Sequence, residues 1–208
     1  MVLRWGILSV VSLPSNDLRY GWTVLRSYGK CRHRKYSARS RHSLGSSTTF
    51  DSALEKPVKL DFRQRIKKGP ILCDGAMGTL LDMYGSGERP HEIQNIMHPE
   101  LVRRIHQEYI DAGAEIIETN TFSANRLRLS QFHLQDRLEE INRAGVEIAR
   151  HAAGDRVYVA GSVGPTGKLL EPIGKIRLSE AREAFKEQIE VLLAAGIDLL
   201  ILETFVSL

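Results

Sequence analysis

The chain has 208 residues, 42% of them apolar and 26% charged, which is typical of a globular protein. Its formal net charge of +4 is unevenly spread: residues 1–50 hold nine Lys or Arg against one acid, Asp17, and the rest holds 20 basic and 24 acidic side chains. The remainder therefore shows no electrostatic sign of nucleic-acid binding, and no apolar run approaches the roughly 20 residues that a membrane span needs. We expect neither a nucleic acid nor a membrane as a partner.

Residues 1–60 are predicted to be a disordered basic leader. Residues 1–50 are rich in Arg and Ser and nearly free of acids, which fits a solvated tail, an organelle transit peptide or a start codon assigned too far upstream. The only two cysteines, Cys31 and Cys73, form neither a disulfide framework nor a zinc knuckle, which suits a reducing compartment. We expect a cytoplasmic protein, with organelle targeting by residues 1–50 as the alternative.

From residue 61 onward, short apolar runs alternate with amphipathic stretches. Helices are predicted over residues 62–68 and 99–112 and from the N-caps Asp136 and Ser179, and strands over 71–73, 115–119, 157–162 and 199–202. The spacing of Asp136 and Glu139 fits a capping box, and Gly113 and Gly196 are placed to end helices.

The predicted strands begin at intervals of 42 to 44 residues, and residues 112–122 align without gaps to residues 195–205. Apolar strands that are each followed by a helix indicate a parallel sheet buried on both faces, in a doubly wound fold or a (β/α)₈ TIM barrel. The barrel is favoured because polar residues follow each strand, and because no G-x-G-x-x-G segment follows the first one. We interpret residues 61–208 as the first four βα units of a barrel, cut at Leu208 just after the fourth strand.

Carboxylates follow the first and fourth predicted strands, at Asp74 and Glu203. Buried acids are costly unless paired, so these two either hold a cationic group of a ligand, such as an α-ammonium, or cap loop amides. The backbone N–H groups around Gly75 are suited to bind a carboxylate. Asn120 and Thr121 are predicted to be substrate contacts or braces. Cys73 is expected to pack in the core, and the histidines of this region to lie at the surface or at helix ends.

Four segments carry a family resemblance: residues 74–79 (DGAMGT), 118–122 (ETNTF), 160–165 (AGSVGP) and 202–205 (LETF). Their order and spacing are similar to those of the homocysteine S-methyltransferase family over about residues 66–208. Residues 167–176 resemble the bacterial enzymes that join this homocysteine-binding domain to a methylenetetrahydrofolate reductase more than the large cobalamin-dependent methionine synthases.

The resemblance implies a (β/α)₈ barrel that binds homocysteine and methylates its sulfur, giving methionine. The residues that it implies for binding the substrate's ammonium and carboxylate are Asp74, Gly75, Ala76 and Glu203, with Asn120 and Thr121 nearby.

The family's Zn²⁺ is held by three cysteines on later strands, which we expect to lie beyond Leu208. Cys31 and Cys73 match neither of the family's cysteine motifs. We therefore expect no catalytic and no metal-ligating residue in this chain.

The methyl donor implied by the resemblance is methyltetrahydrofolate with cobalamin, S-methylmethionine or S-adenosylmethionine. A C-terminal reductase domain, or a cobalamin or folate domain, is the expected partner in a full-length protein. The 208-residue chain alone is expected to be inactive, because zinc is what activates the substrate thiol. The alternatives are a non-catalytic amino-acid-binding half-barrel and a fragment of a TIM-barrel lyase or aldolase, with Asp74 or Glu203 as general base.

Overall fold

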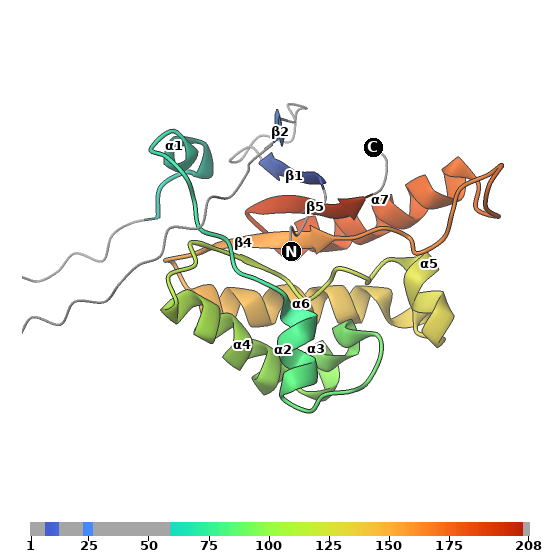
Figure 1. Ribbon diagram of the computed structural model, residues 1–208, viewed down its shortest axis with the longest axis horizontal. Helices are drawn as coiled ribbons and strands as arrows, with labels where there is room; N and C mark the ends of the chain where they lie inside the picture. Colours follow the sequence, from blue (N-terminus) through green and yellow to red (C-terminus); the bar gives the residue numbers. More distant parts are fainter. Residues whose placement is uncertain (1–6, 13–22, 27–58, 206–208) are drawn as a thin grey trace, which may run out of the picture.

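The computed structural model describes residues 7–12, 23–26 and 59–205 (Figure 1). The α-helices are α1 Phe62–Ile66, α2 Met77–Met83, α3 Gln94–Met97, α4 Pro99–Asp111, α5 Arg126–Leu129, α6 Leu138–Ala153 and α7 Leu178–Ala194. The short 3₁₀ helices are η1 His91–Ile93, η2 Ser130–Phe132 and η3 Gln135–Arg137. The strands are β1 Ile7–Ser12, β2 Thr23–Arg26, β3 Ile116–Glu118, β4 Tyr158–Val163 and β5 Leu199–Phe205.

Three parallel strands form the centre of the described fold. β4 pairs in parallel with β3, where Tyr158 aligns with Ile116, and with β5, where Ala160 aligns with Leu199. The predicted first strand, at residues 71–73, is reduced to a single parallel bridge between Cys73 and Ile116. The spatial order of these segments follows their order in the chain, as the βα repeat predicts.

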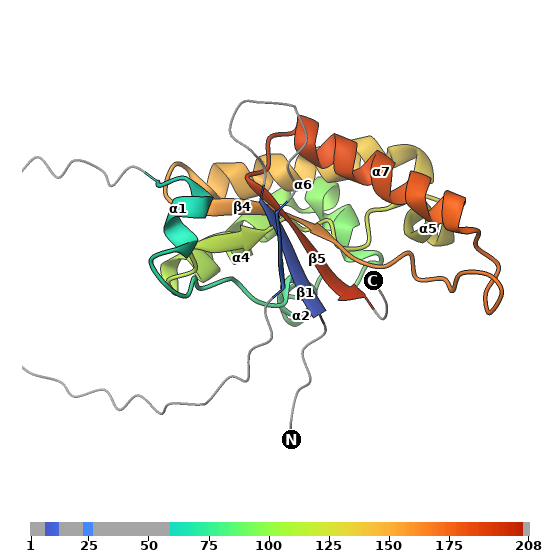
Figure 2. The same ribbon diagram turned by 90° about the horizontal axis from the view of Figure 1, so that it is seen from above.

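β1 and β2 extend the sheet, whose order is β2-β1-β5-β4-β3. Figure 2 shows β1 beside β5. β1 pairs antiparallel with β5, and β2 pairs antiparallel with β1. Neither strand was predicted, because both fall in residues 1–60, where the composition indicates a disordered leader. Residues 1–6, 13–22 and 27–58 of that leader lie outside the described residues.

The predicted cut at Leu208 also lies outside the described residues. The description ends with β5 at Phe205, and residues 206–208 follow it. The predicted fourth strand, at residues 199–202, is confirmed as the first part of β5, which continues three residues further. The number of barrel strands and the cut at Leu208 stay predictions.

Both faces of the parallel strands are buried, as predicted. Ile117, Val159 and Leu200 belong to the main core, which also holds apolar side chains of α6 and α7. On the opposite face the strands pack on α1, whose Phe62 ring lies 5.3 Å from the Tyr158 ring. Figure 1 shows α4 and α6 on one side of the strands and α1 on the other.

One predicted capping box and one predicted helix start are wrong. Asp136 belongs to η3, and α6 begins two residues later with no side-chain cap, so the capping box to Glu139 does not form. α7 begins before Ser179, because the Glu180 carboxylate accepts a hydrogen bond from the Arg177 backbone N–H at 2.8 Å and stabilises the earlier start.

The predicted helix ends are confirmed, whereas the predicted position of one histidine is wrong. Gly113 and Gly196 follow α4 and α7 with φ of 102° and 91°, in the left-handed region that favours glycine. His106 lies fully buried within α4, not at the surface or at a helix end.

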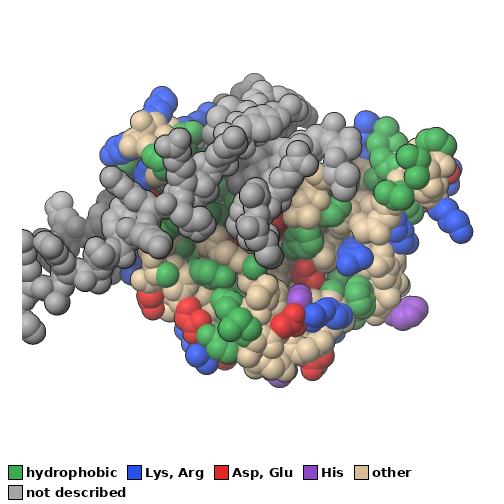
Figure 3. All heavy atoms as spheres, viewed as in Figure 1, with side chains coloured by type: hydrophobic (Ala, Val, Ile, Leu, Met, Phe, Trp, Pro, Cys, Tyr) green, Lys and Arg blue, Asp and Glu red, His purple; other side chains and the backbone are tan. Residues whose placement is uncertain are grey.

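The described surface carries charges of both signs. On the face in Figure 3, Lys and Arg side chains are interspersed with Asp and Glu. Among the described residues, no helix combines the length and the apolar character needed to cross a membrane.

Candidate functional site

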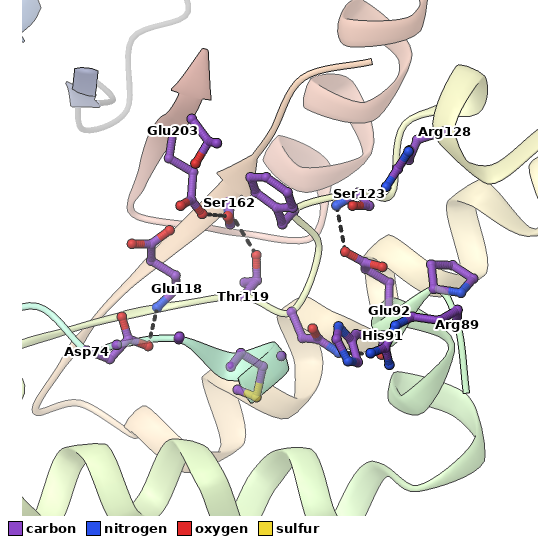
Figure 4. Close-up of a pocket in the computed structure, with 18 of the residues that line it drawn as sticks. Asp74, Arg89, His91, Glu92, Glu118, Thr119, Ser123, Arg128, Ser162 and Glu203 are labelled. Carbon is purple, nitrogen blue, oxygen red and sulfur yellow. Dashed lines mark hydrogen bonds between the residues drawn. The ribbon is translucent and has the colours of Figure 1, made fainter. Parts of the chain in front are cut away.

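A pocket of about 450 Å³ lies at the carboxyl ends of the parallel strands (Figure 4). The residues that line it are Asp74, Gly75, Ala76, Met77, Gly78, Arg89, Pro90, His91, Glu92, Glu118, Thr119, Asn120, Phe122, Ser123, Arg128, Phe132, Ser162, Glu203 and Thr204. Because parallel strands present their carboxyl ends at one edge, residues far apart in the sequence meet here.

Asp74 is held against the neighbouring strand. Its Oδ2 accepts a hydrogen bond from the Glu118 backbone N–H at 2.9 Å, and its Oδ1 accepts one from the Cys73 thiol at 3.4 Å. Burial raises the pKa of Asp74 to about 7, and the negative charge of Glu203 adds to this rise. Its carboxyl group is therefore near its titration midpoint at neutral pH.

Two further carboxylates face the same space. Glu203 in β5 accepts a 2.6 Å hydrogen bond from the Ser162 hydroxyl of β4. Glu118 ends β3, and Figure 4 shows its carboxylate pointing toward that of Glu203. Burial is the largest cause that raises the pKa of Glu118 well above its usual range, followed by the charges of Glu203 and Asp74.

These three carboxylates have no cationic partner in the described part of the chain. Their hydrogen-bond partners there are a thiol, a backbone N–H and a hydroxyl. Among the basic residues that line the same pocket, Arg89 and His91 are bound to Asp82, at 2.9 Å and 3.0 Å, and Arg128 donates to Gln131 Oε1 at 3.0 Å. The acidic side of the pocket is therefore complementary to a cationic group of a ligand.

The backbone before α2 lines the pocket beside Asp74. Neither the Gly75 nor the Ala76 N–H donates a hydrogen bond to another described residue. A Cβ at Gly75 would lie 3.0 Å from the Tyr109 hydroxyl oxygen, so glycine allows the close approach of this backbone to α4. The two amides are placed to donate to an anionic group in the pocket.

Asn120 and Thr121 take different positions. Asn120 lines the pocket, but its Nδ2 donates to the His91 carbonyl at 3.0 Å and to Asn95 Oδ1 at 2.9 Å. Thr121 is absent from the lining, fully buried, and its hydroxyl donates to the Ser162 carbonyl at 2.8 Å. For Thr121 the geometry supports a brace rather than a substrate contact.

Cys73, Asp74 and Glu118 are the described residues grouped closely enough to hold a metal, with one ligand atom of each within 4.8 Å of the others. The group does not fit a zinc ion that binds a substrate sulfur, because Cys73 is not in the pocket lining and packs instead in the apolar cluster around Phe62. Burial, then the charges of Asp74 and Glu118, raise the pKa of the Cys73 thiol, which disfavours the thiolate that zinc binds. This placement agrees with the predicted packing role. The expectation that the family's cysteine ligands lie beyond Leu208 stays a prediction.

Five of the six predicted substrate-binding residues line the pocket, and the main residue that the prediction missed is Glu118. Strand alternation offered a signal, because Glu118 lies two positions after Ile116, whose side chain faces away from the α6–α7 core. Arg89, His91 and Glu92 come from a connection without periodic pattern, so nothing in the sequence placed them here.

Comparison with known proteins identifies relatives of the chain. The family model for homocysteine S-methyltransferase matches residues 71–208. The methionine synthase of Mycobacterium tuberculosis is 34% identical over 171 residues, which is 76% of this chain and 14% of that protein. The methionine synthase of Mycobacterium leprae is 32% identical over 157 residues, 69% of this chain and 13% of that protein. The finer resemblance to reductase-fused enzymes stays a prediction.

Solved structures show the same relationship. The metallated form of the homocysteine methyltransferase MmuM from Escherichia coli has a TM-score of 0.56 at 27% identity, over 68% of this chain and 56% of that one. Its oxidized form has a TM-score of 0.57 at 27% identity, over the same shares of the two chains. The chain thus spans about a seventh of the methionine synthases and little more than half of MmuM. Because the family model covers about two thirds of the sequence, the chain belongs to the homocysteine S-methyltransferase family.

Proposed function

We propose that the pocket binds the amino-acid moiety of homocysteine, and that the chain serves in transfer of a methyl group to the substrate's sulfur, giving methionine. The observation that carries this proposal is the group of three carboxylates, Asp74, Glu118 and Glu203, that face one cavity without a cationic partner among the described residues.

The substrate's ammonium is proposed to lie between Asp74 and Glu203. Both carboxyl groups reach the pocket from different strands, and an ammonium supplies three N–H donors and the missing positive charge. An ammonium at this position would favour the ionised form of Asp74, whose pKa burial now raises to about 7.

The substrate's carboxylate is proposed to accept hydrogen bonds from the Gly75 and Ala76 N–H groups. These amides directly follow Asp74 in the sequence, so a carboxylate bound to them would lie close to an ammonium bound to Asp74. An α-amino acid carries its two charged groups on one carbon and matches this arrangement.

The family resemblance adds zinc, which binds the substrate thiolate when present, and a methyl donor. The described residues do not form a zinc centre that opens to the pocket, so we assign to this chain substrate binding and orientation only. The methyl donor, whether methylcobalamin, S-methylmethionine or S-adenosylmethionine, and any domain that delivers it remain proposals from the resemblance.

Calorimetric titration of the full chain with L-homocysteine tests the proposal. Replacing Glu203 by Gln (Glu203→Gln) removes one charge from the ammonium site, and we expect binding to weaken about 10- to 100-fold. The matched control is Glu147→Gln, because Glu147 is exposed on α6 and its side chain makes no hydrogen bond to the described residues. Equal affinity of Glu203→Gln and the unaltered chain would overturn the proposed ammonium site.

A further inference from the structure

Of the four acids that line the pocket, Asp74 and Glu203 form the proposed ammonium position and Glu92 accepts a hydrogen bond from the Ser123 backbone N–H at 2.6 Å, which leaves Glu118. It ends β3, and its backbone N–H already holds Asp74 in place. Its Oε1 lies 3.7 Å from the Cys73 sulfur, and its Oε2 is buried without a hydrogen-bond partner in the described chain. A buried carboxylate oxygen without a partner is costly if it is charged.

Among the described residues, the groups that face Glu118 are acidic or neutral. From the segment before α2 it is faced by Cys73 and Asp74, and from β5 by Glu203. β4 contributes the Ser162 hydroxyl, which donates to Glu203, and α4 contributes Tyr109 beside Asp74. Of the basic residues that line the pocket, Arg89 and His91 are paired with Asp82, and Arg128 donates to Gln131 Oε1.

Protonation of Glu118 would remove the cost of burying its negative charge beside other acids. A protonated carboxyl group would carry no charge of its own and would offer one O–H donor toward the facing carboxylate of Glu203. Two carboxylates that face each other in a buried site share a proton for the same reason, since both cannot ionise cheaply.

We propose that Glu118 is the proton-holding member of the amine subsite, that it stores one proton in the empty pocket, and that it releases this proton when an ammonium group enters. The inference rests on the proposed function and deepens it by naming a third residue that contacts the substrate's ammonium. The released proton passes from the Glu118 carboxyl group to solvent, the ammonium keeps its three protons, and the negative charge left on Glu118 pairs with the ammonium. No bond of the substrate is made or broken.

The test is calorimetric titration of the full chain with L-methionine, in two buffers of different ionisation enthalpy. Methionine carries the ammonium but no thiol, so a released proton cannot come from the ligand's sulfur. At about pH 8, Asp74 is mostly ionised, and we expect release of about one proton for each methionine bound. Glu118→Gln keeps a hydrogen-bond donor toward Glu203 and is expected to abolish the release, whereas Glu147→Gln is expected to keep it.

A second ligand tests the inference without any variant. In 2-hydroxy-4-(methylthio)butanoate a hydroxyl replaces the ammonium, so its binding to the unaltered chain is expected to release no proton. Methionine binding without proton release, or equal release in Glu118→Gln, would overturn the role of Glu118 and leave the ammonium site intact. Failure of methionine to bind at all would overturn the proposed function and, with it, this inference.

Discussion

Asp74 carries the clearest electrostatic signature of the site. Its carboxyl group is buried beside Glu118 and Glu203, and this environment raises its pKa to about 7. An acid whose pKa is raised on folding favours the folded state only while it is protonated. The unfolded chain ionises Asp74 at about pH 4, so folding loses stability as the pH rises from about 4 to about 7.

This loss of stability with rising pH is expected to be absent in Asp74→Asn, because the asparagine side chain cannot ionise. Relative to the variant, the unligated chain is expected to lose up to about 4 kcal/mol of unfolding free energy between about pH 4 and pH 7. Urea unfolding across this range measures the difference. Asp155→Asn is the control, because Asp155 is exposed and makes no hydrogen bond or ion pair with the described residues. Parallel pH profiles of Asp74→Asn and the unaltered chain would refute the buried environment of Asp74.

Sequence reasoning found the site residues that follow strands and missed those that depend on three-dimensional detail. Asp74, Gly75 and Glu203 stand where an apolar run ends, which is a local and readable signal. Thr121 also follows a strand, but its side chain points away from the pocket and donates a hydrogen bond to the Ser162 carbonyl. The sequence alone does not show which way this side chain points.

At the scale of elements, buried amides fix the loop that follows β3. Asn142 of α6 donates to the Ala124 carbonyl at 2.9 Å, and Gln188 of α7 donates to the Thr121 carbonyl at 2.7 Å. Asn95 of α3 donates to the Asn120 carbonyl at 2.8 Å. Three helices thus satisfy the backbone of this loop and hold the pocket wall that it forms.

Gln188→Leu tests whether these amide hydrogen bonds stabilise the loop after β3. The substitution removes the Gln188 hydrogen bonds to the Thr121 carbonyl and to Asn142 Oδ1, while the Ala124 N–H still donates to that carbonyl at 3.0 Å. We therefore expect a loss of about 1 kcal/mol in unfolding free energy. Urea denaturation measures the loss. Gln64→Leu is the matched control, because Gln64 is exposed on α1 and its side chain makes no hydrogen bond to the described residues. Equal stability of the two variants would contradict a stabilising role of Gln188 in this loop.

The elements themselves were predictable to different degrees. β3, β4 and β5 appear in the sequence as apolar runs of regular spacing, and this pattern was sufficient to predict them as strands. α2 follows a glycine-rich segment that gives no clear helical period, and it was missed. The start of α7 was misplaced because a carboxylate three residues inside the helix, on Glu180, bonds back to Arg177, which competes with the better N-cap residue Ser179.

At the scale of the whole molecule, the parallel sheet follows from the repeat, and the antiparallel edge does not. Ile7 of β1 aligns with Phe205 of β5, a pairing between opposite ends of the chain. Such a pairing depends on which strand edge is open in the folded protein, and no local pattern in residues 1–60 encodes it. The eight-stranded barrel, with its later strands beyond Leu208, stays an expectation of the family resemblance.

The central claim is that one pocket edge binds the two charged groups of homocysteine. A crystal structure of the full chain with L-homocysteine tests it most directly. We predict the substrate nitrogen within hydrogen-bond distance, about 3 Å, of Asp74 and Glu203, and the substrate carboxylate against the Gly75 and Ala76 N–H groups. Homocysteine bound elsewhere, or bound here with its carboxylate toward Asp74 and Glu203, would contradict the account.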